Sequence, residues 1–232
     1  MTKNGTHSGQ NSLLPSSAGF LETSVVEINE ISADVFLLSL EKKFDFRAGQ
    51  VVGIHFEPRP DARLYSIASG EKERYLKILF NIQPGGMLTP RLASCKKGDT
   101  LFTTTPFGWF TCNSDAAWWI ASGTGIAPFA SMFYSGLSEN KTLIHGGRSP
   151  DSFYFQEDFQ KVMKDRYIRC CSGEHKEGLY NGRLTGYLKN LDNLPVNQTY
   201  YLCGRVEMVI EVRDILLKKG IPYRNILSEI YF

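Results

Sequence analysis

Residues 116–128 read A-A-W-W-I-A-S-G-T-G-I-A-P, and this stretch decides the expected fold. An apolar run enters a glycine turn and then an apolar helical stretch that ends near Gly136. A strand that passes into a helix through such a turn is the building unit of doubly wound parallel sheets, and it often holds dinucleotide phosphates. Pro128 stands where the last glycine of a G-x-G-x-x-G turn would fall. A proline in the first helical turn costs no hydrogen bond, so a helix can still begin here.

The rest of the C-terminal half continues the alternation of strand and helix. Short apolar runs predict further strands at 142–145, 167–171, 199–203 and 226–230. Helices are expected between them, at 152–164, 187–191 and 206–219. Strands that alternate with helices predict a parallel sheet of the doubly wound kind.

The N-terminal half has a different rhythm. Short β-rich runs separated by turn residues predict strands at 24–28, 35–40, 51–56, 64–67, 76–82 and 100–104. Only 88–94 has a helical period, so we expect an antiparallel barrel or sandwich. The chain is therefore predicted to have two domains, a β-barrel at 20–113 and an α/β domain at 114–232. Residues 1–19, rich in Ser, Asn and Gly, are predicted to be a disordered tail, although a foreign extension would look the same.

Composition excludes several classes of protein. The 26 basic and 24 acidic residues give a net charge of +2, without the concentrated basic face typical of nucleic-acid binders. No stretch approaches the roughly 18 unbroken apolar residues of a membrane helix, and the N-terminus does not resemble a secretion signal. The five cysteines have no disulfide, zinc or iron–sulfur spacing. We therefore expect no metal site and a cytoplasmic protein.

Two short motifs in the N-terminal half suggest binding chemistry. Arg63-Leu64-Tyr65-Ser66 leaves a predicted strand, and by itself R-x-Y-S is a weak pattern. The second motif, at 85–91, reads G-G-M-L-T-P-R and combines a glycine turn with a helix start. Unpaired N–H groups at a helix start favour a phosphate, although a plain turn before a proline-initiated helix is the simpler alternative.

Five motifs in order resemble the ferredoxin–NADP(H) reductase family, especially its compact bacterial members. They are R-x-Y-S, G-x-L-T-P-R-L, G-T-G-I-A-P, C-G-x-x-x-M and a terminal E-x-Y, and the resemblance extends from Phe20 to the C-terminus. The resemblance implies an FAD-binding barrel followed by an NADP-binding α/β domain. It also implies an enzyme that passes electrons between NADPH and ferredoxin or flavodoxin, through hydride transfer to the flavin N5. We expect a monomer that meets its protein partner transiently.

The resemblance assigns site residues one by one. The flavin would be held by Arg63, Leu64, Tyr65, Ser66, Gly86, Met87, Leu88 and Thr89. Within this set Arg63 would pair with the pyrophosphate and Tyr65 would pack on the isoalloxazine ring. The nicotinamide would meet Gly123, Thr124, Gly125, Cys203, Gly204 and Met208. The catalytic residues would be Ser66, Cys203, Glu229 and Tyr231, and Tyr231 with Phe232 would cover the flavin.

The adenosine end departs from the family pattern. Gly147, Arg148, Ser172 and Arg183 occupy positions where the family binds this part of the dinucleotide, with both arginines on the 2′-phosphate of NADP. The family's S-R-E segment is Ser172-Gly173-Glu174 here, so one arginine is missing. This departure puts strict NADPH preference in doubt.

Simpler and rival interpretations remain open from the sequence. Cys203 alone could be a buried small hydrophobe, and the C-terminal aromatics could merely close the core. An alternative function is the NAD(P)H reductase component of an oxygenase or another multicomponent system. A more distant one is a flavin-binding module without catalytic activity. Three lysine pairs could attract an acidic partner, although solvated surface charge explains them equally well.

Overall fold

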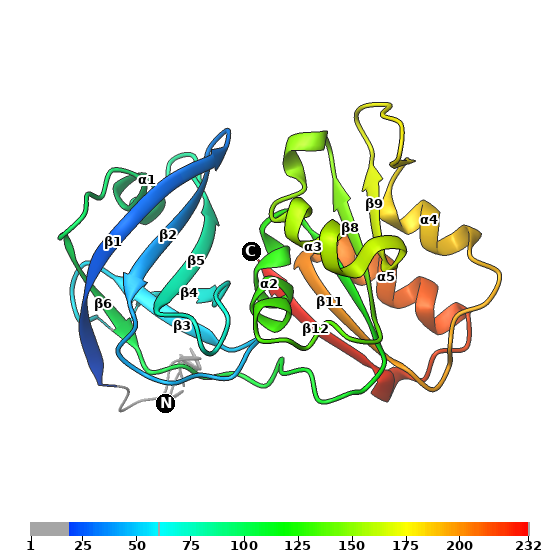
Figure 1. Ribbon diagram of the computed structural model, residues 1–232, viewed down its shortest axis with the longest axis horizontal. Helices are drawn as coiled ribbons and strands as arrows, with labels where there is room; N and C mark the ends of the chain where they lie inside the picture. The colour runs from blue at the N-terminus through cyan, green and yellow to red at the C-terminus, as the bar shows by residue number, and fades with distance from the viewer. Residues whose placement is uncertain (1–18, 60, 232) are drawn as a thin grey trace, which may run out of the picture.

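The computed structural model describes residues 19–59 and 61–231 and consists of two units side by side (Figure 1). The predicted tail at 1–19 therefore lies outside the described residues except for Gly19, and Phe232 also lies outside them. Each unit is built on its own six-stranded sheet. In the described ranges, no helix is both long and apolar enough to cross a membrane.

The first unit is an antiparallel barrel with the strand order β4-β3-β6-β1-β2-β5. Its strands are β1 (Phe20–Ser32), β2 (Val35–Glu41), β3 (Val51–His55), β4 (Arg63–Ser66), β5 (Tyr75–Asn81) and β6 (Thr100–Thr104). A bridge between Ile67 and Ile78 links the outer strands and closes the sheet on itself. Alternate apolar residues such as Leu38, Leu40 and Ile54 fill the interior, and the short helix α1 (Leu88–Ala93) lies outside it.

The second unit is an entirely parallel sheet with the strand order β10-β9-β8-β7-β11-β12. Its strands are β7 (Ala117–Ser122), β8 (Lys141–Gly147), β9 (Tyr167–Cys171), β10 (Tyr180–Asn181), β11 (Thr199–Arg205) and β12 (Ile226–Tyr231). Its helices are α2 (Ala127–Tyr134), α3 (Gln156–Met163), α4 (Leu184–Asn190) and α5 (Val206–Lys218). Alternation along each strand sends Trp119 and Leu143 into one core and Ile120 and Ile144 into the other. The expected doubly wound architecture is confirmed.

Element boundaries differ from the prediction at β1, which runs over Phe20–Ser32 where 24–28 was expected, and at α3. We expected a helix over 152–164, but it begins at Gln156, after a separate 3-10 turn at Pro150–Ser152. The backbone of Phe155 is left-handed, with φ of 61°, and a helix cannot continue through that conformation. Strand β10 was not predicted, because two residues are too short to produce a periodic pattern.

One apolar cluster extends from the barrel into the second unit. Val35 and Leu79 of the barrel belong to the same buried cluster as Phe110, Phe129 and Met132. The connection from β6 to β7 spans residues 105–116, which include the predicted boundary at Asn113. Because the cluster excludes water between the units, it holds the carboxyl ends of the parallel strands against the barrel.

Candidate active site between the two domains

The side chains of Ser66, Glu229 and Tyr231 meet between the domains, although Ser66 is far from the other two in the sequence. Ser66 ends β4, and its Oγ donates a 2.6 Å hydrogen bond to Oε2 of Glu229. The hydroxyl of Tyr231 donates a 2.5 Å hydrogen bond to the same Ser66 Oγ. Parallel pairing sets Cys203 of β11 directly opposite Glu229 of β12. All four residues assigned to catalysis are therefore brought together.

Burial dominates the electrostatics of this cluster. It raises the pKa of the Glu229 carboxyl above its ordinary value, although the hydrogen bond from Ser66 acts in the opposite direction. Burial also raises the pKa of the Cys203 thiol well above its usual range, and the Glu229 charge raises it further. The pKa of the Tyr231 hydroxyl is likewise well raised, chiefly by burial. Cys203 and Tyr231 are therefore protonated at neutral pH, and Cys203 is fully buried, whereas Glu229 and Tyr231 are partly buried.

The glycine turn after β7 packs backbone to backbone against the end of β11. Residues Gly123–Ile126 form a 3-10 turn, and Gly123 has a φ of 55°. A Cβ atom at Gly125 would lie 2.6 Å from the carbonyl carbon of Cys203, so no larger residue fits there. The side chain of Met208 lies beside Gly204. The structure thus gathers the residues assigned to the nicotinamide, with Thr124 half-buried at the turn.

The residues assigned to the flavin lie along β4 and before α1. Arg63 is exposed, Leu64 is 39% exposed, and burial raises the pKa of Tyr65 to about 12. In the glycine turn, the Gln83 amide donates a 2.8 Å hydrogen bond to the Thr89 hydroxyl, which closes the turn. Met87 at its tip is 92% exposed. The backbone of Gly86 is held by a hydrogen bond to the carbonyl of Gln83, and Leu88 packs on the barrel core.

At the other end of the site, the ends of β8 and β9 are tied together. The Ser172 amide donates to the Gly147 carbonyl at 3.0 Å, and the Gly173 amide donates to the Arg148 carbonyl at 2.8 Å. A Cβ atom at Gly173 would lie 2.5 Å from that carbonyl oxygen. Arg148 and Ser172 are exposed neighbours, whereas exposed Arg183 precedes α4 on a separate segment.

Family models account for most of the described chain. Residues 22–112 match the oxidoreductase FAD-binding domain, and residues 119–214 match the oxidoreductase NAD-binding domain. The chain belongs to the ferredoxin–NADP(H) reductase family. It is accordingly an electron-transfer oxidoreductase that uses FAD and a nicotinamide dinucleotide, as the motifs predicted.

The chain is similar to solved structures and to curated proteins. A ferredoxin NADP+ reductase from Neisseria gonorrhoeae superposes with a TM-score of 0.82 at 20% identity, over 92% of this chain and 99% of that one. The phenol hydroxylase P5 protein of Acinetobacter pittii is 27% identical, over 90% of this chain and 64% of that protein. Reductase component 1 of a Comamonas terephthalate 1,2-dioxygenase is 28% identical, over 90% of this chain and 68% of that protein. The chain spans about two thirds of the length of these curated relatives.

The chemistry of the barrel residues fits the FAD of this family. Arg63 is exposed, and its guanidinium can bind phosphate oxygens with two parallel hydrogen bonds. In the glycine turn at 85–87, the exposed residues Gly85 and Met87 offer backbone N–H groups, whereas the Gly86 N–H is already bonded to the Gln83 carbonyl. Two donor groups of this kind suit a pyrophosphate. Tyr65, in the same strand as Arg63, offers an aromatic ring to a flavin.

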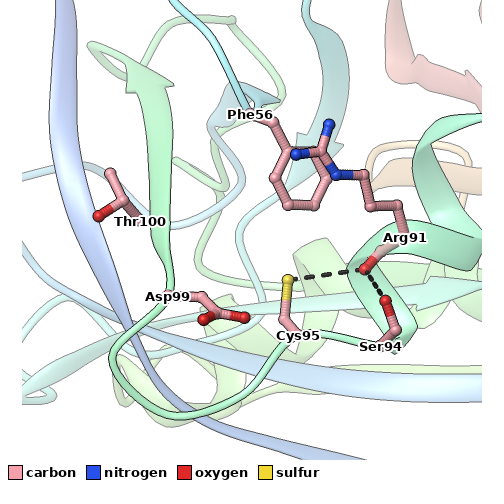
Figure 2. A pocket seen from close by; sticks show the side chains of 6 residues that line it. All are labelled: Phe56, Arg91, Ser94, Cys95, Asp99 and Thr100. Carbon is pink, nitrogen blue, oxygen red and sulfur yellow. Dashed lines mark hydrogen bonds between the residues drawn. The ribbon is translucent and has the colours of Figure 1, made fainter.

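A separate pocket lies at the C-terminal end of α1, as Figure 2 shows. The guanidinium of Arg91 stacks 3.7 Å from the centre of the Phe56 ring. The pocket has a volume of about 320 Å³, and its other lining residues are Ser94, Cys95, Asp99 and Thr100. Arg91 is the last residue of the predicted phosphate motif, and its guanidinium is engaged by this aromatic ring. Arg63 is the arginine that was assigned to the flavin, and it is also exposed.

Sequence reasoning missed the residues that join the two domains near this site. Ser131 in α2 is fully buried, and its hydroxyl donates a 2.7 Å hydrogen bond to the Ser69 carbonyl in the barrel. The only signal in the sequence was a serine within the apolar run 127–134. Because a buried hydroxyl needs a partner, that position could have been marked for a tertiary contact.

Proposed function

We propose that the protein is a reductase that prefers NADPH and exchanges electrons with ferredoxin or flavodoxin. The observation that supports it is the hydrogen-bonded chain from Tyr231 through Ser66 to Glu229, which spans the two cofactor-binding domains. Bound FAD would supply the hydride and single-electron chemistry, which no side chain of this protein provides. Electron flow in either direction is compatible with the proposal. The expected cytoplasmic location and monomeric state stay predictions.

The proposed role of the cluster is to order and protonate the site. Ser66 Oγ accepts one hydrogen bond and donates another, so its orientation is set by Tyr231 and Glu229 together. The Glu229 carboxyl, with its raised pKa, can hold a proton nearer neutral pH than an exposed carboxyl can. Tyr231 and Cys203 stay uncharged beside these two groups, because the pKa of each is raised well above its ordinary value.

An anaerobic titration tests the proposed function. Purified holoprotein is mixed with NADPH or NADH while flavin absorbance is followed, and reduced enzyme is then mixed with a ferredoxin or a flavodoxin. We expect NADPH to bleach the flavin at lower concentration than NADH, and both carriers to reoxidise it. A flavin that neither nucleotide reduces would contradict the proposal.

A second candidate is the reductase component of an oxygenase system. It is favoured by the curated relatives, whose names place them with phenol hydroxylase and terephthalate dioxygenase. This function predicts preference for NADH and electron delivery to an oxygenase or its own ferredoxin. The same titration distinguishes the two candidates by which nucleotide bleaches the flavin first.

The bound flavin is expected to be FAD, with its pyrophosphate held by Arg63 and the turn at 86–89. Heat releases the flavin, and chromatography against standards identifies it. A matched variant, Arg63→Ala, should release FAD more readily than the wild type, because each charge-assisted hydrogen bond contributes roughly 1.5–3 kcal/mol. Recovery of FMN from the wild type would contradict this prediction.

Arg148 is expected to bind the 2′-phosphate of NADP. Arg148→Ala should weaken NADPH binding by roughly tenfold to a hundredfold and leave NADH binding nearly unchanged. Arg183→Ala is expected to act in the same direction. Dissociation constants for both nucleotides, measured by titration of flavin absorbance, check this. Equal losses for NADPH and NADH would show that these arginines do not contact the 2′-phosphate.

Restoring the family's missing arginine is expected to harm NADPH binding. Gly173→Arg adds a guanidinium, but its Cβ would collide with the Arg148 carbonyl and displace the β8 end. Gly173→Ala adds the same Cβ without the charge, so both variants should lose NADPH affinity. A gain of NADPH affinity in Gly173→Arg alone would show that the added charge outweighs the collision.

A further inference from the structure

Helix α2 connects the nicotinamide turn to the barrel. The turn at Gly123–Ile126 leads directly into α2, and Figure 1 shows α2 on the side of the second domain that faces the barrel. Ser131 lies in its middle and is fully buried. Its hydroxyl donates to the carbonyl of Ser69, which is three residues beyond Ser66. Helix α2 therefore has the nicotinamide turn at its N-terminal end. At its middle it is hydrogen-bonded to the barrel segment that follows Ser66.

The last turn of α2 makes two more contacts with the same barrel segment. A Cβ atom at Gly70 would lie 2.6 Å from the carbonyl oxygen of Tyr134, so the two backbones touch. The amide of Glu71 donates a 3.0 Å hydrogen bond to the Ser135 hydroxyl. The segment at 69–71 is thus fitted against the C-terminal half of α2.

The barrel holds this segment from its other side. The Lys77 amide donates to the Ser69 hydroxyl at 3.0 Å, and the Ala48 amide donates to Oε1 of Glu71 at 2.8 Å. The Lys42 ammonium donates to the Glu71 carbonyl at 2.7 Å. A segment anchored in this way cannot move without the barrel. A shift of α2 therefore has to break the Ser131–Ser69 contact or move the barrel with it.

We propose that Ser131 is a positioning residue that fixes the separation between the nicotinamide turn and the Ser66 strand. The inference rests on the proposed function only in that flavin and nicotinamide meet between these two segments. From Thr124 to Ser131 the chain advances about 10 Å along a rigid helical path. Because Ser131 is hydrogen-bonded to Ser69, this length also fixes the distance from the nicotinamide turn to the barrel. Because a misplacement of about 1 Å can slow a reaction roughly a hundredfold, such a link bears directly on rate.

The hydrogen bond at Ser131 is suited to holding a fixed distance between α2 and the barrel segment at 69–71. Its donor hydroxyl and the Ser69 acceptor both lie away from solvent, so water does not compete for the bond while the domains stay packed together. Alanine at this position would keep the helix and most of the apolar packing, while removing the hydroxyl that donates to the Ser69 carbonyl. The expected consequence is a looser relation between the two segments without loss of either domain's fold.

The test compares Ser131→Ala with Ser138→Ala in the holoprotein. Ser138 is also buried and lies just beyond α2, but its backbone carbonyl, not its hydroxyl, binds Arg166 and Lys141. Single-turnover reduction by NADPH gives the rate and the dissociation constant separately. Long-wavelength absorbance reports stacking of nicotinamide on flavin. Hydrogen exchange of the Gly70 and Glu71 amides, measured without nucleotide, reports the link itself.

Ser131→Ala should slow reduction of the flavin about tenfold and weaken the stacking absorbance. It should also speed hydrogen exchange at the Gly70 and Glu71 amides. Its dissociation constant for NADPH should stay near that of the wild type. Ser138→Ala should leave all four quantities unchanged. Unchanged reduction and exchange in Ser131→Ala, or equal changes in Ser138→Ala, would overturn the inference. If Ser131→Ala does not fold, Ser135→Ala, which removes the Glu71 contact, is judged by the same measures. A wild-type flavin that no nucleotide reduces would refute the proposed function, while amide exchange would still test Ser131.

Discussion

Replacing Ser66 by alanine is expected to slow reduction of bound FAD by roughly 10²–10³-fold while the FAD stays bound. Ser66 bridges Tyr231 and Glu229, accepting from one and donating to the other. Without it both partners lose their orientation in a buried site, where water does not readily replace them. Arg63 and residues 86–89, which are proposed to bind the pyrophosphate, are untouched, so flavin affinity should change little.

The pH dependence of the reaction should shift in the same variant. The hydrogen bond from Ser66 stabilises the ionised Glu229 carboxyl and lowers its pKa, against the larger effect of burial. Removing the donor leaves burial unopposed, so the pKa of Glu229 rises further. The inflection that Glu229 causes in the pH profile should therefore move to higher pH in Ser66→Ala and vanish in Glu229→Gln.

Stopped-flow reduction across a pH series checks both expectations, with Ser39→Ala as the control. Ser39 is another buried serine of the barrel, located in β2. The control should reduce at the wild-type rate. If Ser66→Ala loses its flavin while the remaining holoprotein is reduced normally, the role of Ser66 is structural and the proposed cluster does not serve hydride transfer.

Acid is expected to weaken the fold through His145. This histidine in β8 is fully buried, and one ring nitrogen contacts the Tyr167 hydroxyl at 3.1 Å while Nε2 has no hydrogen-bond partner in the described ranges. Burial lowers its pKa to about 3, and the positive charge of Arg169 contributes in the same direction. The folded protein therefore keeps this ring neutral at any physiological pH.

The sign of the pH effect follows from proton binding. An unfolded chain binds a proton at His145 below a pKa of roughly 6.5, whereas the folded chain excludes it until about pH 3. The stability that depends on neutral His145 is complete above pH 6.5 or so and is lost progressively toward pH 3, by about 5 kcal/mol in total. Between neutral pH and about pH 5 the loss is about 2 kcal/mol.

Denaturant unfolding of the wild type and His145→Gln measures this loss. The difference in unfolding free energy between the two proteins should shrink by about 2 kcal/mol from neutral pH to about pH 5, because only the wild type carries the buried imidazole. His175→Gln is the matched control, since His175 is exposed. A difference that stays constant across this pH interval would contradict the assignment of acid sensitivity to His145.

Local patterns were sufficient to predict the two domains and their order. The turn at 122–128 follows a buried strand and precedes a helix, and all of the information for that unit lies within a few neighbouring residues. The same holds for the strands of the barrel, whose lengths are set by turn residues between them. The site residues themselves were assigned only through the resemblance carried by the motifs. Their roles stay predictions until the variants are measured.

Boundaries were less predictable wherever a single backbone conformation decided them. The periodic pattern over 152–164 continues without interruption, yet the left-handed Phe155 delays α3 to Gln156. The side chain of a phenylalanine does not favour that conformation, so packing must impose it. Hydrophobic periodicity reports which face of a segment is buried, and it contains no information about one residue's φ angle.

Contacts across the domain boundary were decided by the tertiary structure alone. The sequence identified Ser66 and Glu229 separately, but 163 positions divide them, and no local pattern determines that their oxygens lie 2.6 Å apart. The contact of Ser131 with Ser69 is of the same kind. Strand formation and turn chemistry depend on near neighbours, whereas these distances result from the summed packing of both domains over the shared apolar cluster.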